Sequence, residues 1–180
     1  MWARLLGPTL TRREYVGYSK CAVPAPTVEA LRGYKLIGIF FGADWCKPCM
    51  EFKPGLEKLY SAQAAQGADR LEIVLASRCR EAKATKHFSL GMPWQAMYHD
   101  ANNKIGMKSR TTALMAKFGI TTIPALVLLD ERGQVICKDG RGWCAADPMG
   151  LAFPWQGKAK GGPVARAVVH FDLPPAERGQ

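Results

Sequence analysis

Residues 40–49 read FFGADWCKPC, in which Cys46 and Cys49 stand between a predicted strand and a predicted helix. The apolar run at 36–41 is too short to span a membrane and contains β-branched and aromatic residues, which indicates a buried strand. Gly42 ends this run, and a segment rich in good helix formers follows the second cysteine. The free N–H groups and the positive dipole end at the start of a helix stabilise a thiolate, so a cysteine there is chemically reactive.

The spacing predicts different roles for the two cysteines. We expect Cys46 to face solvent at the helix tip and act as the nucleophile, while Cys49 lies one turn deeper and resolves the mixed disulfide. Lys47 adds a positive charge beside Cys46, and Pro48 takes a first-turn position where a missing N–H costs no hydrogen bond. If Cys46 were covered by other side chains, or too far from Cys49 to bond with it, only a scaffold would remain.

Two structural alternatives for the cysteine pair are half of a zinc site and two incidental buried thiols. Zinc needs four ligands, usually with a second Cys or His pair. The remaining cysteines form no second CxxC and the histidines stand singly: Cys21, Cys79, Cys137, Cys144, His87, His99 and His170. A CxxC beside a strand–helix–strand pattern is typical of redox chemistry, which we favour, and no metal site is expected.

Residues 41–49, followed by Phe52-Lys53-Pro54, resemble the thioredoxin superfamily, and within it the tryparedoxin and nucleoredoxin branch, whose usual motif is WCPPC followed by F-x-P. Further motifs occur in the family's order: Met92-Pro93-Trp94, Ile123-Pro124, Asp147-Pro148 and Phe153-Pro154-Trp155. The resemblance covers about residues 5–155. It implies an α/β fold, a thioredoxin-like three-layer α/β/α sandwich with a central mixed sheet at 1–155, followed by a C-terminal extension at 156–180.

The resemblance also implies a thiol–disulfide oxidoreductase with Cys46 and Cys49 as its catalytic residues. The residues expected to bind substrate or tune the thiols are Trp45, Lys47, Pro48, Ile123 and Pro124. No cofactor is implied beyond the redox-active disulfide, which an external dithiol reductant such as trypanothione or glutathione would restore. The implied clients are disulfide-containing proteins such as peroxiredoxin-type peroxidases.

By the same resemblance, Ile123-Pro124 forms a cis peptide that faces the two cysteines. A proline there cannot donate a hydrogen bond, while the backbone of Ile123 can pair with an extended substrate as a strand would. The proline also crowds the thiols and disfavours metal or cluster ligation. An ordinary loop proline is the alternative.

The motif departs from the family at three positions. Lys47 replaces the usual proline and Met50 the usual arginine. Phe40 occupies the place of a buried aspartate in thioredoxins and a tyrosine in tryparedoxins, a group that helps to move the proton of the deeper cysteine. We therefore predict an active oxidoreductase with reduced or altered activity.

The stretch from 71 to 117 is basic, with eight Lys or Arg against three Asp or Glu, in a chain whose net charge is +10. The corresponding stretch of tryparedoxins is rich in Asp and Glu, and their reductant trypanothione is itself cationic. A basic surface near the cysteines should repel it, so trypanothione is predicted to be a poor reductant here. The alternative is a solvated face without a partner.

Length and composition indicate one globular domain in a reducing compartment. The chain has 180 residues, 48% of them hydrophobic and 22% charged, and no apolar stretch approaches the ~18 residues of a membrane helix. Six cysteines are too few for a secreted disulfide scaffold, and no signal-peptide pattern opens the chain, so we expect a cytoplasmic protein. The basic residues 1–13 leave a mitochondrial presequence open, although Pro8 favours reading 5–10 as the first element of the fold.

A second function class stays open: a thioredoxin-fold binding or structural module that uses its basic surface in an RNA–protein or cytoskeletal assembly. The intact CxxC favours the oxidoreductase, whereas the altered residues around it, the basic charge and the tail favour the module. Basic charge without clustered aromatic residues is weak support for nucleic-acid binding. A metal or iron–sulfur carrier is the third alternative.

The rest of the chain predicts elements around the motif. The motif helix should run from 46 to about 66, and a strand at 71–76 should pair in parallel with the motif strand. The later elements are a helix at 110–118 stopped by Gly119, and a hairpin of strands at 125–129 and 134–137. Residues 21–27 read as extended or turn. Cys137 and Cys144 are expected to be packing residues, although an exposed Cys144 would allow a secondary disulfide.

Overall fold

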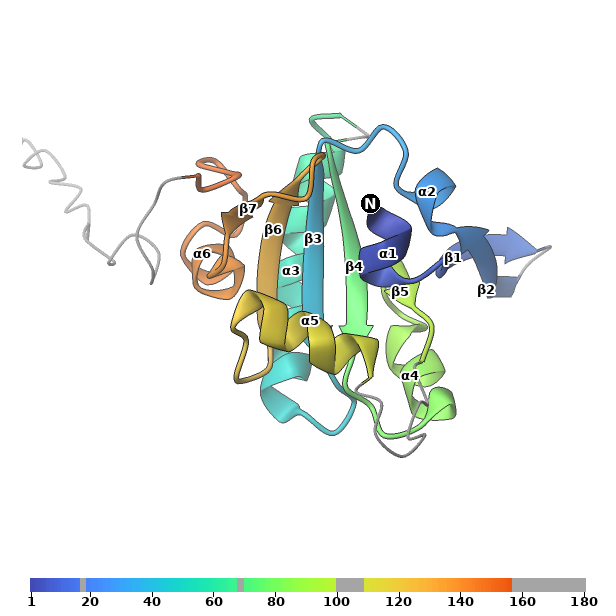
Figure 1. The fold of residues 1–180 in the computed structure, drawn as a ribbon. Helices are drawn as coiled ribbons and strands as arrows, with labels where there is room; N and C mark the ends of the chain where they lie inside the picture. The colour runs from blue at the N-terminus through green and yellow to red at the C-terminus, as the bar shows by residue number, and fades with distance from the viewer. Residues whose placement is uncertain (17–18, 68–69, 100–108, 157–180) are drawn as a thin grey trace, which may run out of the picture.

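A mixed sheet forms the centre of the fold, and helices cover both of its faces (Figure 1). The computed structural model describes residues 1–16, 19–67, 70–99 and 109–156, with the backbone alone at 13–16 and 19–21. Among these residues seven strands pair in the order β2-β1-β5-β4-β3-β6-β7. The strands are β1 (Thr9–Val16), β2 (Ser19–Pro26), β3 (Leu36–Gly42), β4 (Leu71–Ser77), β5 (Gln95–Met97), β6 (Ala125–Asp130) and β7 (Val135–Cys137).

The helices divide between the two faces of the sheet. They are α1 (Trp2–Leu6), α2 (Thr27–Ala30), α3 (Lys47–Ala64), α4 (Ala82–Ser89), α5 (Arg110–Phe118) and α6 (Gly140–Ala146). In Figure 1, α5 crosses in front of β3 and β4, while α3 lies behind them. One apolar cluster fills the α3 side, around Phe40, Leu56 and Trp94, and a second fills the α1 and α5 side, around Ile39, Phe41 and Leu114. The predicted three-layer arrangement is confirmed.

The motif strand β3 lies at the centre of the sheet. It pairs in parallel with β4, where Gly42 stands opposite Ser77, and antiparallel with β6. Residues Ile37 to Gly42 are all buried, as expected for a strand covered on both faces. Because the carboxyl ends of β3 and β4 meet at one edge, the loops that follow Gly42 and Ser77 lie side by side.

Several predicted elements occur where the sequence indicated them. The motif helix α3 begins after Cys46 and contains Pro54 in its interior, and α5 ends at Gly119, which adopts the left-handed φ of 68°. The predicted hairpin is β6 and β7. Leu6 and Leu10 are buried, so the first residues belong to the fold.

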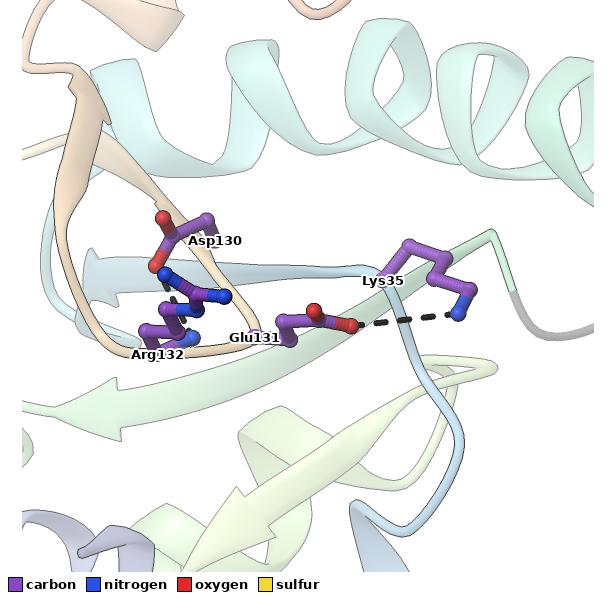
Figure 2. A network of polar contacts seen from close by, with 4 residues as sticks. All are labelled: Lys35, Asp130, Glu131 and Arg132. Carbon is purple, nitrogen blue, oxygen red and sulfur yellow. Dashed lines mark hydrogen bonds and ion pairs between the residues drawn. The ribbon is translucent and has the colours of Figure 1, made fainter.

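The turn of this hairpin is closed by a side chain. Asp130 Oδ1 accepts hydrogen bonds from the backbone N–H groups of Arg132 (2.9 Å) and Gln134 (2.8 Å), and Figure 2 shows the first of them. The neighbouring ion pair between Lys35 and Glu131 spans 3.8 Å, and both side chains are more than half exposed. Such a pair contributes little to stability.

The N-terminal hairpin was only partly predicted. Residues 21–27, read as extended or turn, lie mostly in β2, which pairs with β1 at the sheet edge. The predicted extension beyond 156 lies outside the described residues, as does most of the polar stretch at 100–109. Within the described residues, no helix is both long and apolar enough to cross a membrane.

Candidate active site

The two motif cysteines are joined by a disulfide at the start of α3. Cys46 is the N-cap residue and Cys49 lies in the first turn, with 5.2 Å between their Cα atoms. The backbone N–H of Cys49 donates a hydrogen bond to Cys46 Sγ at 3.2 Å. The predicted pairing is confirmed, and an N–H group of the first helical turn points at Cys46 Sγ.

The prediction that Cys46 faces solvent is wrong. Cys46 is 5% exposed and Cys49 is fully buried. The Cys46 sulfur lies 3.8 Å from the carbonyl oxygen of Ile123, and both cysteines join the apolar cluster that contains Phe40. Packing against the opposing loop, which sequence spacing does not reveal, covers the Cys46 side chain. Of the two conditions given above for a scaffold, the first is nearly met because Cys46 is almost covered, and the second is not met because Cys46 is bonded to Cys49. Cys46 remains the more accessible of the two.

The Ile123-Pro124 peptide bond is cis, and this loop lies against Cys46. Ile123 is half-buried and Pro124 is buried. Pro124 lines a cavity of about 220 Å³ together with Lys138 and Arg141. The backbone carbonyl of Ile123 is therefore placed beside the Cys46 sulfur.

Trp45, Lys47 and Pro48 surround the disulfide and are all exposed. The Trp45 side chain is oriented by a hydrogen bond from its indole Nε1 to the carbonyl oxygen of Arg78, at 3.1 Å. Pro48 lines a second cavity, of about 540 Å³, which it shares with Arg141. The apolar ring of Trp45, the cation of Lys47 and the rigid first turn at Pro48 thus lie around the Cys46 sulfur.

Two residues that hold the active-site loop were not singled out from the sequence. The backbone N–H of Arg78 donates to the carbonyl oxygen of Gly42 (2.8 Å), and the carbonyl oxygen of Arg78 accepts from the Trp45 indole. Cys79 Sγ accepts the backbone N–H of Asp44 at 3.4 Å, and burial raises the pKa of this thiol. The available signal was the parallel pairing of β3 and β4, which places the residues after Ser77 beside the loop after Gly42.

The other described cysteines lie in the core. Cys137 and Cys144 are buried, the second at 1% exposure, so the alternative of an exposed Cys144 is wrong. Burial, together with the nearby Asp147 carboxylate, raises the pKa of Cys144 to about 12. Nothing is described for the side chain of Cys21. Among the described residues, no three His, Cys, Asp or Glu side chains gather as metal ligands would.

Phe40, at the position where the resemblance implies a polar group, is an aromatic core residue. Its ring contacts Phe52 and Trp94, with centroid distances of 5.8 and 6.3 Å. Phe40 is fully buried in the same cluster as Cys49. On the side of Cys49 that faces Phe40, the surroundings of the sulfur are therefore apolar.

Comparisons with known proteins agree with this geometry. A family model described as thioredoxin-like matches residues 33–135. Nucleoredoxin from Danio rerio is 34% identical over 124 residues, which cover 67% of this chain and 28% of that protein. Tryparedoxin from Trypanosoma brucei brucei is 30% identical over 122 residues, which cover 67% of this chain and 79% of that protein. The chain thus matches little more than a quarter of the length of the nucleoredoxin.

Solved structures give the same result. A tryparedoxin from Trypanosoma brucei has a TM-score of 0.67 at 27% identity, covering 86% of this chain and 96% of that one. Tryparedoxin II complexed with glutathionylspermidine has a TM-score of 0.65 at 27% identity, covering 74% of this chain and 88% of that one. This protein, with its Cys46–Cys49 pair, therefore belongs to the thioredoxin-like family, in the tryparedoxin and nucleoredoxin branch, and has the fold of its oxidoreductases.

Proposed function

We propose that the protein is a thiol–disulfide oxidoreductase that reduces disulfides of client proteins through Cys46 and Cys49. The observation that carries this proposal is the disulfide between them at the start of α3, with the N–H of Cys49 directed at Cys46 Sγ. An N–H donor and a helix N-terminus stabilise negative charge on sulfur, which is the form that attacks a disulfide.

The reaction proceeds in two exchanges. The Cys46 thiolate attacks one sulfur of the client disulfide, a Cys46–client disulfide forms, and the other client sulfur leaves as a thiolate. Phe40 offers no acceptor and Cys49 is buried, so the client thiolate released in the first exchange takes up the proton of the Cys49 thiol. The Cys49 thiolate then attacks Cys46 Sγ and breaks the Cys46–client bond. The Cys46–Cys49 disulfide forms and the client leaves reduced. An external dithiol supplies two electrons to restore both thiols.

The client is an extended segment that carries its disulfide past the loop at Ile123. The backbone of Ile123 pairs with that segment, and the exposed Trp45 ring gives it an apolar contact. Because Cys46 is only 5% exposed, a mobile client segment reaches it more readily than a rigid surface does. Disulfide-bearing proteins such as peroxiredoxin-type peroxidases are the client class that the family relationship suggests.

The reductant is a low-molecular-weight dithiol or glutathione. The exposed cations Lys47, Arg78 and Arg80 stand on the active-site loop and the loop beside it, so a cationic dithiol such as trypanothione is disfavoured. The comparison to make is the rate of Cys46–Cys49 reduction by trypanothione and by dithiothreitol at low and high salt. At low salt, trypanothione should reduce the Cys46–Cys49 disulfide more slowly than dithiothreitol does. The rate with trypanothione should rise as salt screens the repulsion.

A binding module that keeps the fold without the chemistry is the second candidate, and the low exposure of Cys46 is the observation that favours it. An insulin-reduction assay separates the oxidoreductase from the binding module. The oxidoreductase requires Cys46 for insulin reduction with dithiothreitol as the electron source, whereas the module does not change the rate above background.

The decisive variants are Cys46→Ser, Cys49→Ser and the matched control Cys137→Ser, which removes a thiol outside the motif. We expect Cys46→Ser to abolish insulin reduction, Cys49→Ser to accumulate a mixed disulfide visible on a non-reducing gel, and Cys137→Ser to retain activity. Unchanged reduction by Cys46→Ser would remove the catalytic assignment.

A further inference from the structure

Among the described residues, three hydrogen bonds join the loop between β3 and α3 to the loop that follows β4. The backbone N–H of Arg78 donates to the Gly42 carbonyl oxygen, and the Trp45 indole donates to the Arg78 carbonyl oxygen. The third bond runs from the backbone N–H of Asp44 to Cys79 Sγ, at 3.4 Å. The first two use main-chain atoms of Arg78, so of these three bonds only the third depends on a side chain of the loop after β4.

Cys79 is itself held by a series of hydrogen bonds. Its backbone N–H donates to Ser77 Oγ at 3.0 Å, and Ser77 Oγ lies 3.1 Å from Thr85 Oγ1 on α4. Thr85 Oγ1 is also 2.9 Å from His99 Nδ1, beyond the end of β5. Because neighbouring bonds of the series share a residue, the acceptor of the Asp44 N–H is anchored to β4, to α4 and to the segment after β5.

This series of bonds is largely shielded from water. Thr85 is 5% exposed and Cys79 is 6% exposed, and Cys79 belongs to the apolar cluster that contains Cys46 and Cys49. Burial raises the pKa of the Cys79 thiol, so its sulfur stays protonated near neutral pH and accepts the Asp44 N–H without carrying a charge. A buried neutral thiol is a poor nucleophile, so the arrangement suits Cys79 to holding the loop and not to attacking a disulfide.

The loop that Cys79 holds leads directly into the N-cap of α3. Cys46 follows Asp44 by two residues, and its backbone N–H donates to the Ala43 carbonyl oxygen at 3.3 Å. A displacement at Asp44 therefore reaches Cys46 within this turn. The Cys49 N–H lies 3.2 Å from Cys46 Sγ, and a donor fixed in this way stabilises negative charge without reorganising when the charge develops.

We propose that Cys79 is a positioning residue for disulfide exchange: its sulfur, fixed through Ser77 and Thr85, holds the loop that places Cys46 against the Cys49 N–H. Without this acceptor the Asp44 N–H loses its partner, the loop is less firmly held, and the Cys46 thiolate is less stabilised. The inference rests on the proposed function for its biological meaning. Its test concerns the ionisation of Cys46, which is measurable without a client protein.

The test is the pH dependence of Cys46 alkylation by iodoacetamide in the reduced full chain, with the label located by peptide mass spectrometry. Cys79→Ala removes the acceptor, whereas Cys79→Ser keeps one in a side chain of similar size to alanine. We expect Cys79→Ala to raise the pH midpoint of alkylation by about half a unit, which is a roughly threefold lower rate below the midpoint, as the loss of one hydrogen bond predicts. Cys79→Ser should stay close to the wild-type midpoint. Cys137→Ala, which removes a thiol with a similar exposure of 7%, is the matched control and should not shift it.

Thr85→Val removes the hydroxyl group behind Ser77 and should shift the midpoint in the same direction by a smaller amount. It replaces Cys79→Ala as the test if that variant does not fold, which thermal unfolding shows. Thr111→Val, at a threonine of α5 that is 6% exposed, is its matched control.

A wild-type midpoint in Cys79→Ala, or in Thr85→Val where it replaces that variant, would overturn the proposal. Equal shifts in Cys79→Ala and Cys79→Ser would assign the effect to the lost volume of the sulfur and would also overturn it. These results are independent of the proposed function. Insulin reduction retained by Cys46→Ser would refute the oxidoreductase and leave the midpoint shift in place, whereas an unshifted midpoint would leave the oxidoreductase standing.

Discussion

The ring of Phe40 lies directly beneath Gly42, so closely that a Cβ built on Gly42 would come 2.8 Å from Phe40 Cζ. The two residues share one face of β3, two positions apart, and the ring fills the space below the loop that carries Cys46. An apolar ring therefore occupies the β3 position where the resemblance implies a polar group. The absence of a side chain at Gly42 is what allows it.

Gly42→Ala should destabilise the protein by about 1–3 kcal/mol, because the added methyl group forces the buried ring to move. The measurement is the free energy of unfolding in urea. Gly55→Ala in α3 is the matched control, since nothing lies within 4 Å of the Cβ it would add. That variant should be stabilised by about 0.5–1 kcal/mol through helix propensity. Similar effects at the two glycines would contradict the close packing of Phe40.

Glu72→Gln should make stability less dependent on pH. Burial is the main reason that the pKa of Glu72 rises from 4.5 to about 7, against hydrogen bonds from Ile73, Tyr34, Gln95 and Tyr60 that lower it. The unfolded chain releases this proton near pH 4.5 and the folded protein only near pH 7. Between these values the unfolded state binds fewer protons, so stability falls as pH rises.

The full effect at Glu72 amounts to about 3 kcal/mol above pH 7. Glutamine keeps a carbonyl oxygen for the Ile73 N–H, which lies 2.9 Å from Glu72 Oε1, and does not ionise. Urea unfolding should therefore show that the free energy of unfolding of Glu72→Gln, relative to that of the wild type, is larger at pH 8 than at pH 5. Glu29→Gln, at an exposed position, should have the same free energy of unfolding as the wild type at both pH values. If the difference in unfolding free energy between Glu72→Gln and the wild type were the same at pH 5 and pH 8, Glu72 would not titrate between these pH values.

Trp45→Phe should weaken the binding of protein substrates more than it slows the chemistry. Phenylalanine keeps an apolar ring but lacks the N–H that bonds to the Arg78 carbonyl oxygen, so the ring is no longer held beside Cys46. We expect the KM for insulin to rise about threefold with kcat little changed. Arg78→Ala is the informative control because it retains the backbone carbonyl. An equal rise in KM for Arg78→Ala would assign the effect to charge instead.

Cys144 should resist alkylation in the folded, reduced protein. With its pKa raised to about 12 by burial and by Asp147, about one thiol in ten thousand is ionised near pH 8. Iodoacetamide followed by peptide mass spectrometry should label Cys46 first and Cys144 only after denaturation. Labelling of both at the same rate in the native state would show that Cys144 is accessible.

Much of the fold was readable from local patterns. The strand before the CxxC, the helices α3 and α5, and the hairpin after Pro124 follow from hydrophobic periodicity, helix stops and turn residues, all of which act within a few positions. The cysteine pair followed from its spacing. The pairing of β1 with β5, where Leu10 stands opposite Met97, joins residues far apart in the chain, and no local pattern indicates it.

By itself, the sequence indicated the fold family through the motifs that it shares with that family, and indicated the pair of sulfurs that bond through the CxxC spacing, because each of these signals lies within a short stretch of the chain. Only the tertiary structure decided that Cys46 is nearly covered, that Trp45 is held by the Arg78 carbonyl oxygen, and that Phe40 plugs the space under Gly42. These depend on how close the loops after β3 and β4 and the Ile123-Pro124 turn approach one another. That distance is set by packing of the whole sheet and not by any one segment.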